Sequence, residues 1–453
     1  MSTKDVANFI ASTSFNQLSS GVIAKAKVAI RDSLGVSLAA HNDRAVEAVR
    51  KVAIAMGGRE ESTLMGIGTK VPCNMAAWVN AVMGSTLDMD DGIFGPEGHR
   101  CHPGAMVVPS SLALAERQNS TGKSLIEAVV VGYEVAIRNG AMMAEGKGGI
   151  QAGIGGNYGA AAAAAKLLGL TPEKIVNALG IAEAHRPYPT PAAIFRDKNS
   201  SPQEFMKHTP MTKENYGWAA MTGVTAALLA QAGFSAGRTI FDLPMYNQKI
   251  LGTLGKEWEI LNIYFKPYST CRALHASIGG VLELIKKHNL PPDDISKITT
   301  GVSSIRAEMS NYRPSTRWEA QYSIPFAIGA ALVDGEVGPK QIAEEKLDNK
   351  EILTQADKVL VFIDPEVEAL MPGIDASSVE IETRGGAKFK TFQRYPWGEP
   401  QNPLSEEDLK EKFRKLATGA LGVEKTEELI KCVSRLEDLS SINELLEKVA
   451  HCG

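Results

Sequence analysis

The strongest chemical signal in this sequence is a run of three aspartates followed shortly by two histidines. Asp88, Asp90 and Asp91 precede His99 and His102 in a stretch rich in glycine and proline. Carboxylates this close together are unfavourable unless hydrogen-bond donors, a cation or a raised pKa hold them. Aspartate and histidine can together transfer protons near neutral pH. The alternatives are a solvated acidic loop, or a hard-metal site that lacks further carboxylates.

A second candidate segment runs from Lys266 to His275 and enters a predicted helix. Ser269 or Thr270 is expected to cap this helix, which would place Arg272 and His275 on one face. The start of a helix offers free N–H groups and partial positive charge, which favours a carboxylate ligand. The alternative for His275 is a hydrogen-bonded core histidine. Lys213, before a helix of small residues, is a third candidate for a substrate carboxylate or else a solvated lysine.

The composition excludes several classes of protein. The chain has 453 residues, which favours two domains, and a net charge of −4 without a basic block, which argues against a nucleic-acid partner. We see no targeting segment and no apolar run long enough to span a membrane, so a cytoplasmic protein is expected. The five cysteines form no C-x-x-C pair, so neither a metal site nor an iron–sulfur cluster is predicted.

The periodicity predicts helices almost exclusively up to about residue 245, and again after residue 405. Between them, β-branched alternation from Ile295 to Ile305, a short run from Lys358 to Ile363 and a hairpin around Gly385-Gly386 indicate strands. Helical stretches interleave with these strands. The predicted fold class is therefore mainly α with a smaller α+β domain.

Several segments together resemble the MmgE/PrpD family, and the resemblance covers nearly the whole chain. The motifs that carry it are Ala76 to Asn80 before the aspartates, His102-Pro103-Gly104, Gly132 to Val135, Tyr158-Gly159-Ala160, Leu229 to Gly233, Lys266 to His275, Ala320 to Pro325 and Trp397 to Leu404. The resemblance implies a large helical domain at 1–260, with 400–453 packing back onto it, and an α+β lid at 261–399. It also implies a homodimer without a metal or other cofactor.

The resemblance further implies the roles of single residues. Asp88, His102, Lys213 and His275 match catalytic positions of the family, and Lys266 and Arg272 lie nearby in the same segment as the last of them. Three more residues are expected to bind substrate, namely Asp91, His99 and Gln151. Gln151 is the nearest polar residue where many family members have a histidine. The range 93–98 resembles an insertion, and Gly92 stands where the decarboxylase branch has threonine.

These residues predict a lyase that removes a proton alpha to a carboxylate of a small di- or tricarboxylic acid. A dehydratase similar to 2-methylcitrate dehydratase is preferred, because that is the commonest assignment in the family. An epimerase of the iminodisuccinate type or a cis-aconitate-type decarboxylase is the alternative, since all three reactions pass through related carbanions. A more remote alternative is a carboxylate-binding protein without catalysis.

Overall fold

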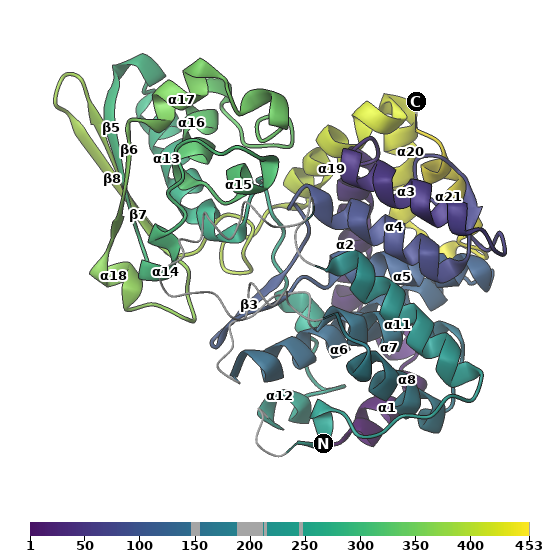
Figure 1. The fold of residues 1–453 in the computed structure, drawn as a ribbon. Helices are drawn as coiled ribbons and strands as arrows, with labels where there is room; N and C mark the ends of the chain where they lie inside the picture. Colours follow the sequence, from purple (N-terminus) through teal and green to yellow (C-terminus); the bar gives the residue numbers. More distant parts are fainter. Residues whose placement is uncertain (146–154, 188–211, 213–214, 244–247, 453) are drawn as a thin grey trace.

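The chain folds into a large helical part and a smaller α+β part, seen on the right and left of Figure 1. The computed structural model describes residues 1–145, 155–187, 212, 215–243 and 248–452. Helices dominate and the sheets are small, which confirms the predicted fold class. Within these residues no helix is both long and apolar enough to cross a lipid bilayer.

The helical part combines the first half of the chain with its C-terminal end. Its α-helices are α1 Thr3–Ser12, α2 Ser20–Ala39, α3 Arg44–Met56, α4 Cys73–Thr86, α5 Gly104–Arg117, α6 Gly122–Glu145, α7 Gly156–Leu167, α8 Pro172–Ala184, α11 Tyr216–Gln231, α12 Gln248–Gly252, α19 Glu406–Leu421, α20 Val423–Ser434 and α21 Asn443–Ala450. Small residues allow α6 and α7 to pack closely. Gly132 of α6 and Gly159 of α7 face each other so closely that a side chain on either would meet the other's carbonyl oxygen.

The α+β part is built around one four-stranded sheet. Its elements are α13 His275–His288, β5 Ile295–Val302, α14 Ser304–Ala307, α15 Arg317–Gln321, α16 Ile324–Asp334, α17 Lys350–Ala356, β6 Val359–Ile363, α18 Pro365–Glu368, β7 Ser377–Thr383 and β8 Lys388–Gln393. The strand order is β6-β5-β7-β8, with β5 parallel to β6 and the other pairs antiparallel. Every second residue of β7 is buried, and α13 packs against this strand. The period-two pattern of the sequence is therefore the buried face of the sheet.

Short 3-10 turns connect many of these elements: η1 Phe15–Gln17, η2 Ile240–Asp242, η3 Glu259–Asn262, η4 Arg272–Leu274, η5 Pro292–Asp294, η6 Glu344–Lys346 and η7 Leu436–Asp438. Two separate hydrophobic cores underlie the two parts. One core takes its residues from Val6 to Phe265 and again from Leu404 to Val449, and the other from Tyr268 to Ile381. On this basis we propose the division into 1–260 with 400–453, and 261–399.

The structure adds detail to one sequence-based prediction about local structure and corrects the end of another. The helical part is interrupted by two short antiparallel pairs, β1 Ser62–Thr63 with β2 Lys70–Val71, and β3 Ile93–Gly95 with β4 Gly98–Cys101. Such short strands carry too few residues to show an alternating pattern. The strand predicted from Ile295 to Ile305 ends at Val302, because α14 begins at Ser304. The apparent insertion at 93–98 is thus part of the hairpin formed by β3 and β4.

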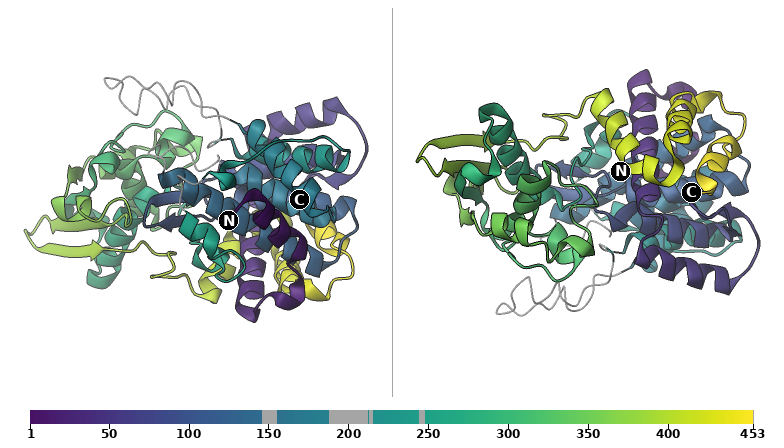
Figure 2. Two further views of the ribbon diagram at one scale, coloured as in Figure 1. Left: turned by 90° about the horizontal axis from the view of Figure 1, so that it is seen from below. Right: turned by 90° about the horizontal axis from the view of Figure 1, so that it is seen from above.

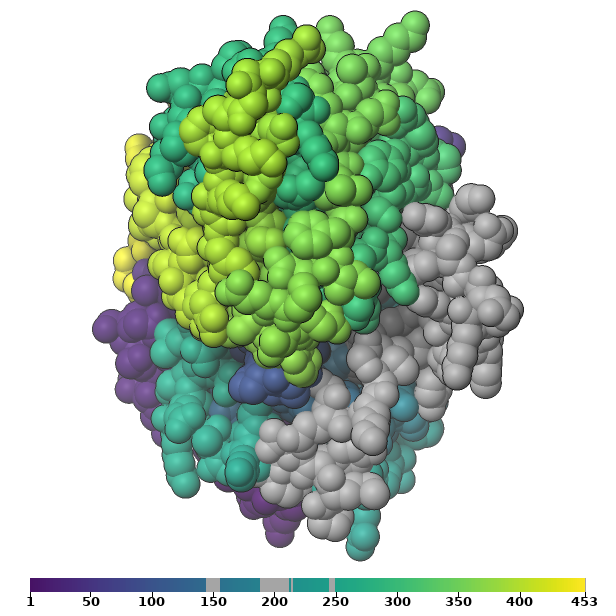
Figure 3. Space-filling model, turned by 90° about the vertical axis from the view of Figure 1, so that its left-hand side faces the viewer, coloured from purple at the N-terminus to yellow at the C-terminus, as the bar shows by residue number. Residues whose placement is uncertain are grey.

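The C-terminal helices return to the N-terminal ones, and Figure 2 shows the yellow and purple segments side by side in both views. In Figure 3 the α+β part covers the upper half of the face and the helical part the lower half. The ring of Phe413 in α19 lies against Gly35 of α2, where an added Cβ would come within 2.8 Å of the ring. This close contact attaches α19 to the core of the first half of the chain.

We predict that Phe413→Ala destabilises the protein by about 3–5 kcal/mol, because it removes a buried aromatic ring and leaves a cavity between α2 and α19. Phe413 is 1% exposed. Urea unfolding followed by circular dichroism measures the change. Lys410→Ala, at a partly exposed position of the same helix, is the control and should stay within about 0.5 kcal/mol. A loss below 1 kcal/mol in Phe413→Ala would contradict the prediction.

Candidate active site

The three aspartates lie in a buried loop that begins where α4 ends. Leu87 closes the helix, and Asp88 follows with a φ of +50°, a left-handed conformation that aspartate tolerates better than most residues. Its N–H donates to the carbonyl of Ser85 at 3.1 Å. This sharp change of direction turns the loop inward, so that Asp88, Asp90 and Asp91 are all 2% exposed or less. The solvated acidic loop is therefore excluded.

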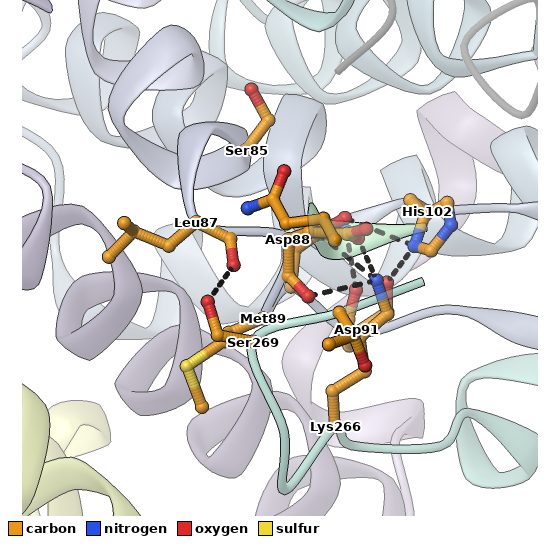
Figure 4. A network of polar contacts seen from close by, with 12 residues as sticks. Ser85, Leu87, Asp88, Met89, Asp91, His102, Lys266 and Ser269 are labelled. Atoms are coloured by element: carbon orange, nitrogen blue, oxygen red, sulfur yellow. Dashed lines mark hydrogen bonds and ion pairs between the residues drawn. The ribbon is translucent and has the colours of Figure 1, made fainter. Parts of the chain in front are cut away.

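A buried lysine compensates these carboxylates. Lys266 is fully buried, and its ammonium forms an ion pair with the carboxylate of Asp88. The same nitrogen lies 3.7 Å from Asp90 Oδ1 and donates to the Asp88 carbonyl at 3.3 Å. Figure 4 shows the lysine approaching the loop from the segment that leads into the α+β part. Removing either partner of such a pair would leave an uncompensated buried charge.

His102 lies on the other side of the loop. Its Nδ1 is 2.7 Å from the carbonyl oxygen of Asp91 and 3.0 Å from Asp90 Oδ2. Because a carbonyl oxygen only accepts hydrogen bonds, Nδ1 must carry the proton in this contact. The lone pair of the neutral ring is then on Nε2, which becomes the nitrogen able to accept a proton. The carboxylate of Asp90 stabilises the ring when it is positively charged.

Asp91 anchors the loop to two helices. It accepts a hydrogen bond from the N–H of Gly104 at 2.8 Å, at the start of α5, and another from the Tyr133 hydroxyl of α6 at 2.7 Å. Burial raises the pKa of Asp91 to about 7, although both donors lower it. Gly104 is required here because a Cβ would come within 2.5 Å of the carboxylate. The expected contact between Asp91 and substrate stays a prediction.

The β3–β4 hairpin and the segment that links the two parts of the chain, which contains Tyr264 and Lys266, form a second wall of the site. The rings of His99 and His102 have centroids 4.6 Å apart. Gly92 pairs through its backbone with Tyr264, and a side chain at position 92 would overlap the hydroxyl of this tyrosine. The tyrosine ring in turn lies edge-on to His102, with centroids 6.2 Å apart. The absence of a side chain at Gly92 therefore makes room for the ring of Tyr264.

Arg272 extends this wall into the α+β part. Its guanidinium lies 4.0 Å from the ring centroid of Phe94, which belongs to the hairpin. It also forms ion pairs with Glu399 and, at 3.2 Å, with Asp375. These two carboxylates, which sequence reasoning missed, already compensate the positive charge. Their positions far along the chain gave no signal of proximity. The role of Arg272 in binding a substrate carboxylate stays a prediction.

The expected helix cap before His275 was wrong. Neither Ser269 nor Thr270 caps a helix; η4 comes first, and α13 begins at His275 itself. The hydroxyl of Ser269 instead donates to the carbonyl of Leu87 at 2.6 Å, which joins the segment to the end of α4 (Figure 4). His275 is 2% exposed, and its Nε2 lies 3.3 Å from the carbonyl oxygen of Thr270.

The structure thus brings most of the predicted site residues into one connected region. Asp88, Asp91, His102 and Lys266 belong to the network drawn in Figure 4, whereas His275 lies at the start of α13. Lys213 and Gln151 lie outside the described residues. Sequence reasoning named Asp90 without a role, and it missed Tyr133, Tyr264 and Lys412. These three belong to helices or strand-like segments, where nothing in the local sequence separates them from core residues.

The described residues contain no group of three or more histidine, cysteine or acidic side chains arranged to hold a metal ion. What they offer is proton transfer and fixed charge. A histidine with a defined basic nitrogen, a carboxylate behind it and a buried ammonium lie around one point. Such a set can move a proton and stabilise an anion.

The chain therefore has a helical part and an α+β part, with a buried acid–base cluster where it passes from one to the other. This combination defines the class of protein, and family models identify the family. The models of the MmgE/PrpD N-terminal domain and the MmgE/PrpD C-terminal domain match residues 4–253 and 268–438. The chain belongs to the MmgE/PrpD family.

The curated relatives are similar over more than nine tenths of their own length. Cis-aconitate decarboxylases of Mus musculus and Homo sapiens are both 27% identical, over 98% of this chain and 92% and 93% of their own length. A cis-aconitate decarboxylase of Aspergillus terreus is 25% identical, over 98% of this chain and 95% of its own. These similarities support a lyase of this family. The preferred dehydratase is not confirmed, whereas the decarboxylase alternative is matched.

The raised pKa of Asp91 predicts a pH-dependent contribution to stability. The carboxyl keeps its proton in the folded state up to about pH 7, but the unfolded state loses it near pH 3.8. The contribution is therefore complete below about pH 4 and is lost as the pH rises through 7, with a slope of up to about 1.4 kcal/mol per pH unit. The free energy of unfolding of the wild type, relative to Asp91→Asn, should fall over this window.

Urea unfolding at several pH values between 4 and 8 measures this difference in the free energy of unfolding. Tyr133→Phe is the matched variant: it removes a donor that lowers the pKa of Asp91, so the window should extend to higher pH. If the difference in unfolding free energy between wild type and Asp91→Asn stays constant with pH, the raised pKa of Asp91 is disproved.

Proposed function

We propose that this chain is a lyase that acts on a small di- or tricarboxylic acid through a carbanion next to a carboxylate. The observation that carries the proposal is the buried ammonium of Lys266, held by Asp88 beside the His102–Asp90 pair. A fixed cation and a proton-transfer group at one place are what carbanion chemistry requires.

Lys266 has the role of stabilising negative charge. When a bond at the carbon next to a carboxylate breaks and leaves its electron pair behind, the charge spreads onto the carboxylate oxygens. An ammonium that is already oriented needs no reorganisation as this charge develops, and one such donor is typically worth about 3–4 kcal/mol. Asp88 keeps Lys266 in place in the absence of substrate.

His102 has the role of transferring the proton. Nδ1 is occupied by the Asp91 carbonyl and Asp90, so that Nε2 gains and loses the proton. Asp90 stabilises the charged ring, in the way that a buried carboxylate orients the histidine of a catalytic triad. His275 is the second proton-transfer group in our proposal, because in a dehydration one group removes the proton from carbon and a second protonates the leaving hydroxide.

Among the possible lyase reactions, we propose decarboxylation of a cis-aconitate-type acid as the first to test, since the curated relatives carry that name. The bond to the departing carboxylate breaks, carbon dioxide leaves, and its electron pair remains as a delocalised carbanion. His102 then donates a proton to this carbanion, which completes the product. Dehydration would use the same groups, with proton removal first and loss of hydroxide second.

Proton NMR in deuterated buffer tests this proposal. The purified protein is incubated with a chelator and with a panel of cis-aconitate-like, citrate-like, malate-like and aminodicarboxylic acids. We expect loss of carbon dioxide and deuterium at one carbon of the product. An alkene formed with loss of water would identify a dehydratase, and deuterium at an inverted centre an epimerase. Binding of these acids without any exchange at carbon would favour the non-catalytic alternative.

Variants of the three proposed groups test their roles separately. Lys266→Met should lower kcat by about 10²- to 10³-fold, because it removes the fixed charge. His102→Gln should lower kcat by about 10²- to 10⁴-fold, because it removes the proton carrier. His275→Gln should have a comparable effect if both histidines transfer protons. Circular dichroism confirms that each variant is folded; turnover above one tenth of the wild type in His102→Gln would rule out the proposed mechanism.

The homodimer, the cytoplasmic location and the polycarboxylate substrate remain predictions. Sedimentation equilibrium of the purified chain tests the first of them. We expect a mass of twice 48.5 kDa.

A further inference from the structure

A lysine from the C-terminal helix α19 reaches the middle of the aspartate loop. Lys412 Nζ donates to the carbonyl oxygen of Met89 at 2.9 Å and to Asp32 Oδ1 of α2 at 2.6 Å. The side chains of Lys412 and Asp32 are 7% and 5% exposed. Met89, labelled in Figure 4, stands between the Asp88 that pairs with Lys266 and the Asp90 that contacts His102.

Asp32 lies in the same poorly solvated interior as the loop. Burial raises its pKa, the charge of Lys412 lowers it, and the charge of Asp90 raises it again. Its own negative charge contributes to the raised pKa values of Asp91 and Tyr133. The second oxygen of the Asp32 carboxylate has no hydrogen-bond partner among the described residues. A buried carboxylate with one unpaired oxygen is costly, so a contact that only joins two helices would gain nothing from it. The negative charge of this carboxylate, however, extends into the aspartate loop.

We propose that Lys412 and Asp32 form a positioning pair for the proposed reaction. Lys412 fixes the Met89 carbonyl, and thereby the directions of Asp88 and Asp90, while Asp32 orients the ammonium. Together the two charges set the electrostatic field in which the loop carboxylates ionise. This proposal rests on the proposed function. It adds that residues of α2 and α19, which lie far apart in the sequence, hold the loop from behind without touching the substrate.

A second lysine that joins α2 to the C-terminal region shows what is particular to Lys412. Lys27 of α2 also joins a carboxylate and a carbonyl of the C-terminal region, Glu437 and Ser434, each at 2.8 Å. Its side chain is 19% exposed, and neither partner belongs to the aspartate loop. Lys27 is therefore a tie of matched chemistry between α2 and the C-terminal region, and it serves as the control.

Several charged or titratable groups face Asp90 and its neighbours, and any pH effect must be attributed among them. Lys412 and Asp32 are two. The others are Asp88 and Asp91 of the loop, His102 after β4, Lys266 of the linking segment, Arg31 and Lys25 of α2, and Tyr133 of α6. The test therefore compares variants that change only one charge of the pair.

The experiment measures kcat, KM and the pH profile of kcat/KM for the full chain and four variants. Lys412→Met should lower kcat about 10- to 100-fold with a smaller change in KM, because misplaced catalytic groups lose rate rather than binding. Its acidic limb should move to higher pH, since a positive charge near the carboxylates is lost. Asp32→Asn should move that limb to lower pH. Lys412→Arg keeps the charge and should keep the wild-type limb, and Lys27→Met should match wild type in all three quantities.

Loss of activity in Lys412→Met with an unmoved acidic limb, or limbs moved in the same direction by Lys412→Met and Asp32→Asn, would overturn the proposal. If the wild type turns over none of the acids, the proposed function has failed, and the pair is then tested directly. Carbon-13 NMR of aspartate-labelled protein follows the buried carboxylates with pH. Titration midpoints moved in opposite directions by the two variants support the pair, and midpoints unchanged in both overturn it.

Discussion

The ion pair between Lys266 and Asp88 is the interaction on which the surrounding structure depends. Both side chains are fully buried, so neither charge has water to replace a missing partner. The two residues come from different places: Asp88 from the end of α4, and Lys266 from the segment that leads into the α+β part. Satisfying this pair fixes where the second part of the chain begins relative to the first. The bond from Ser269 to the Leu87 carbonyl reinforces the same junction.

A loop that holds three buried carboxylates must be tied from several directions, and each tie has a local consequence. Lys266 holds one side, Tyr133 of α6 another, and Lys412 of α19 a third. The crowding explains the two glycines of the loop region, since Gly92 and Gly104 have no space for a side chain. It also explains why the C-terminal helices return to the N-terminal ones: part of the support for the loop comes from there.

The proposed carbanion chemistry does not by itself select one reaction, because dehydration, decarboxylation and epimerisation pass through related anions. The selection must come from the groups around the substrate. For the proposed site we expect these groups to include the β3–β4 hairpin, whose Phe94 stacks on Arg272, and Tyr264 opposite Gly92. Arg272 and Arg306 pair with Glu399 and Asp375, so the two positive charges of this network balance its two carboxylates.

The sequence by itself determined the fold class, the approximate positions of the strands of the main sheet, and the family, because these follow from periodicity and from motifs that are local in the chain. It also identified Asp88, His102 and Lys266 as members of a site, since unusual residue types cluster there. Only the tertiary structure decided which charges meet. That Asp90 contacts His102, that Glu399 and Asp375 compensate Arg272, and that Lys412 reaches Met89 depend on contacts between residues up to 323 positions apart. Charged residues on amphipathic helices look alike in sequence whether they end in solvent or in the core, because burial is a property of packing and not of local pattern.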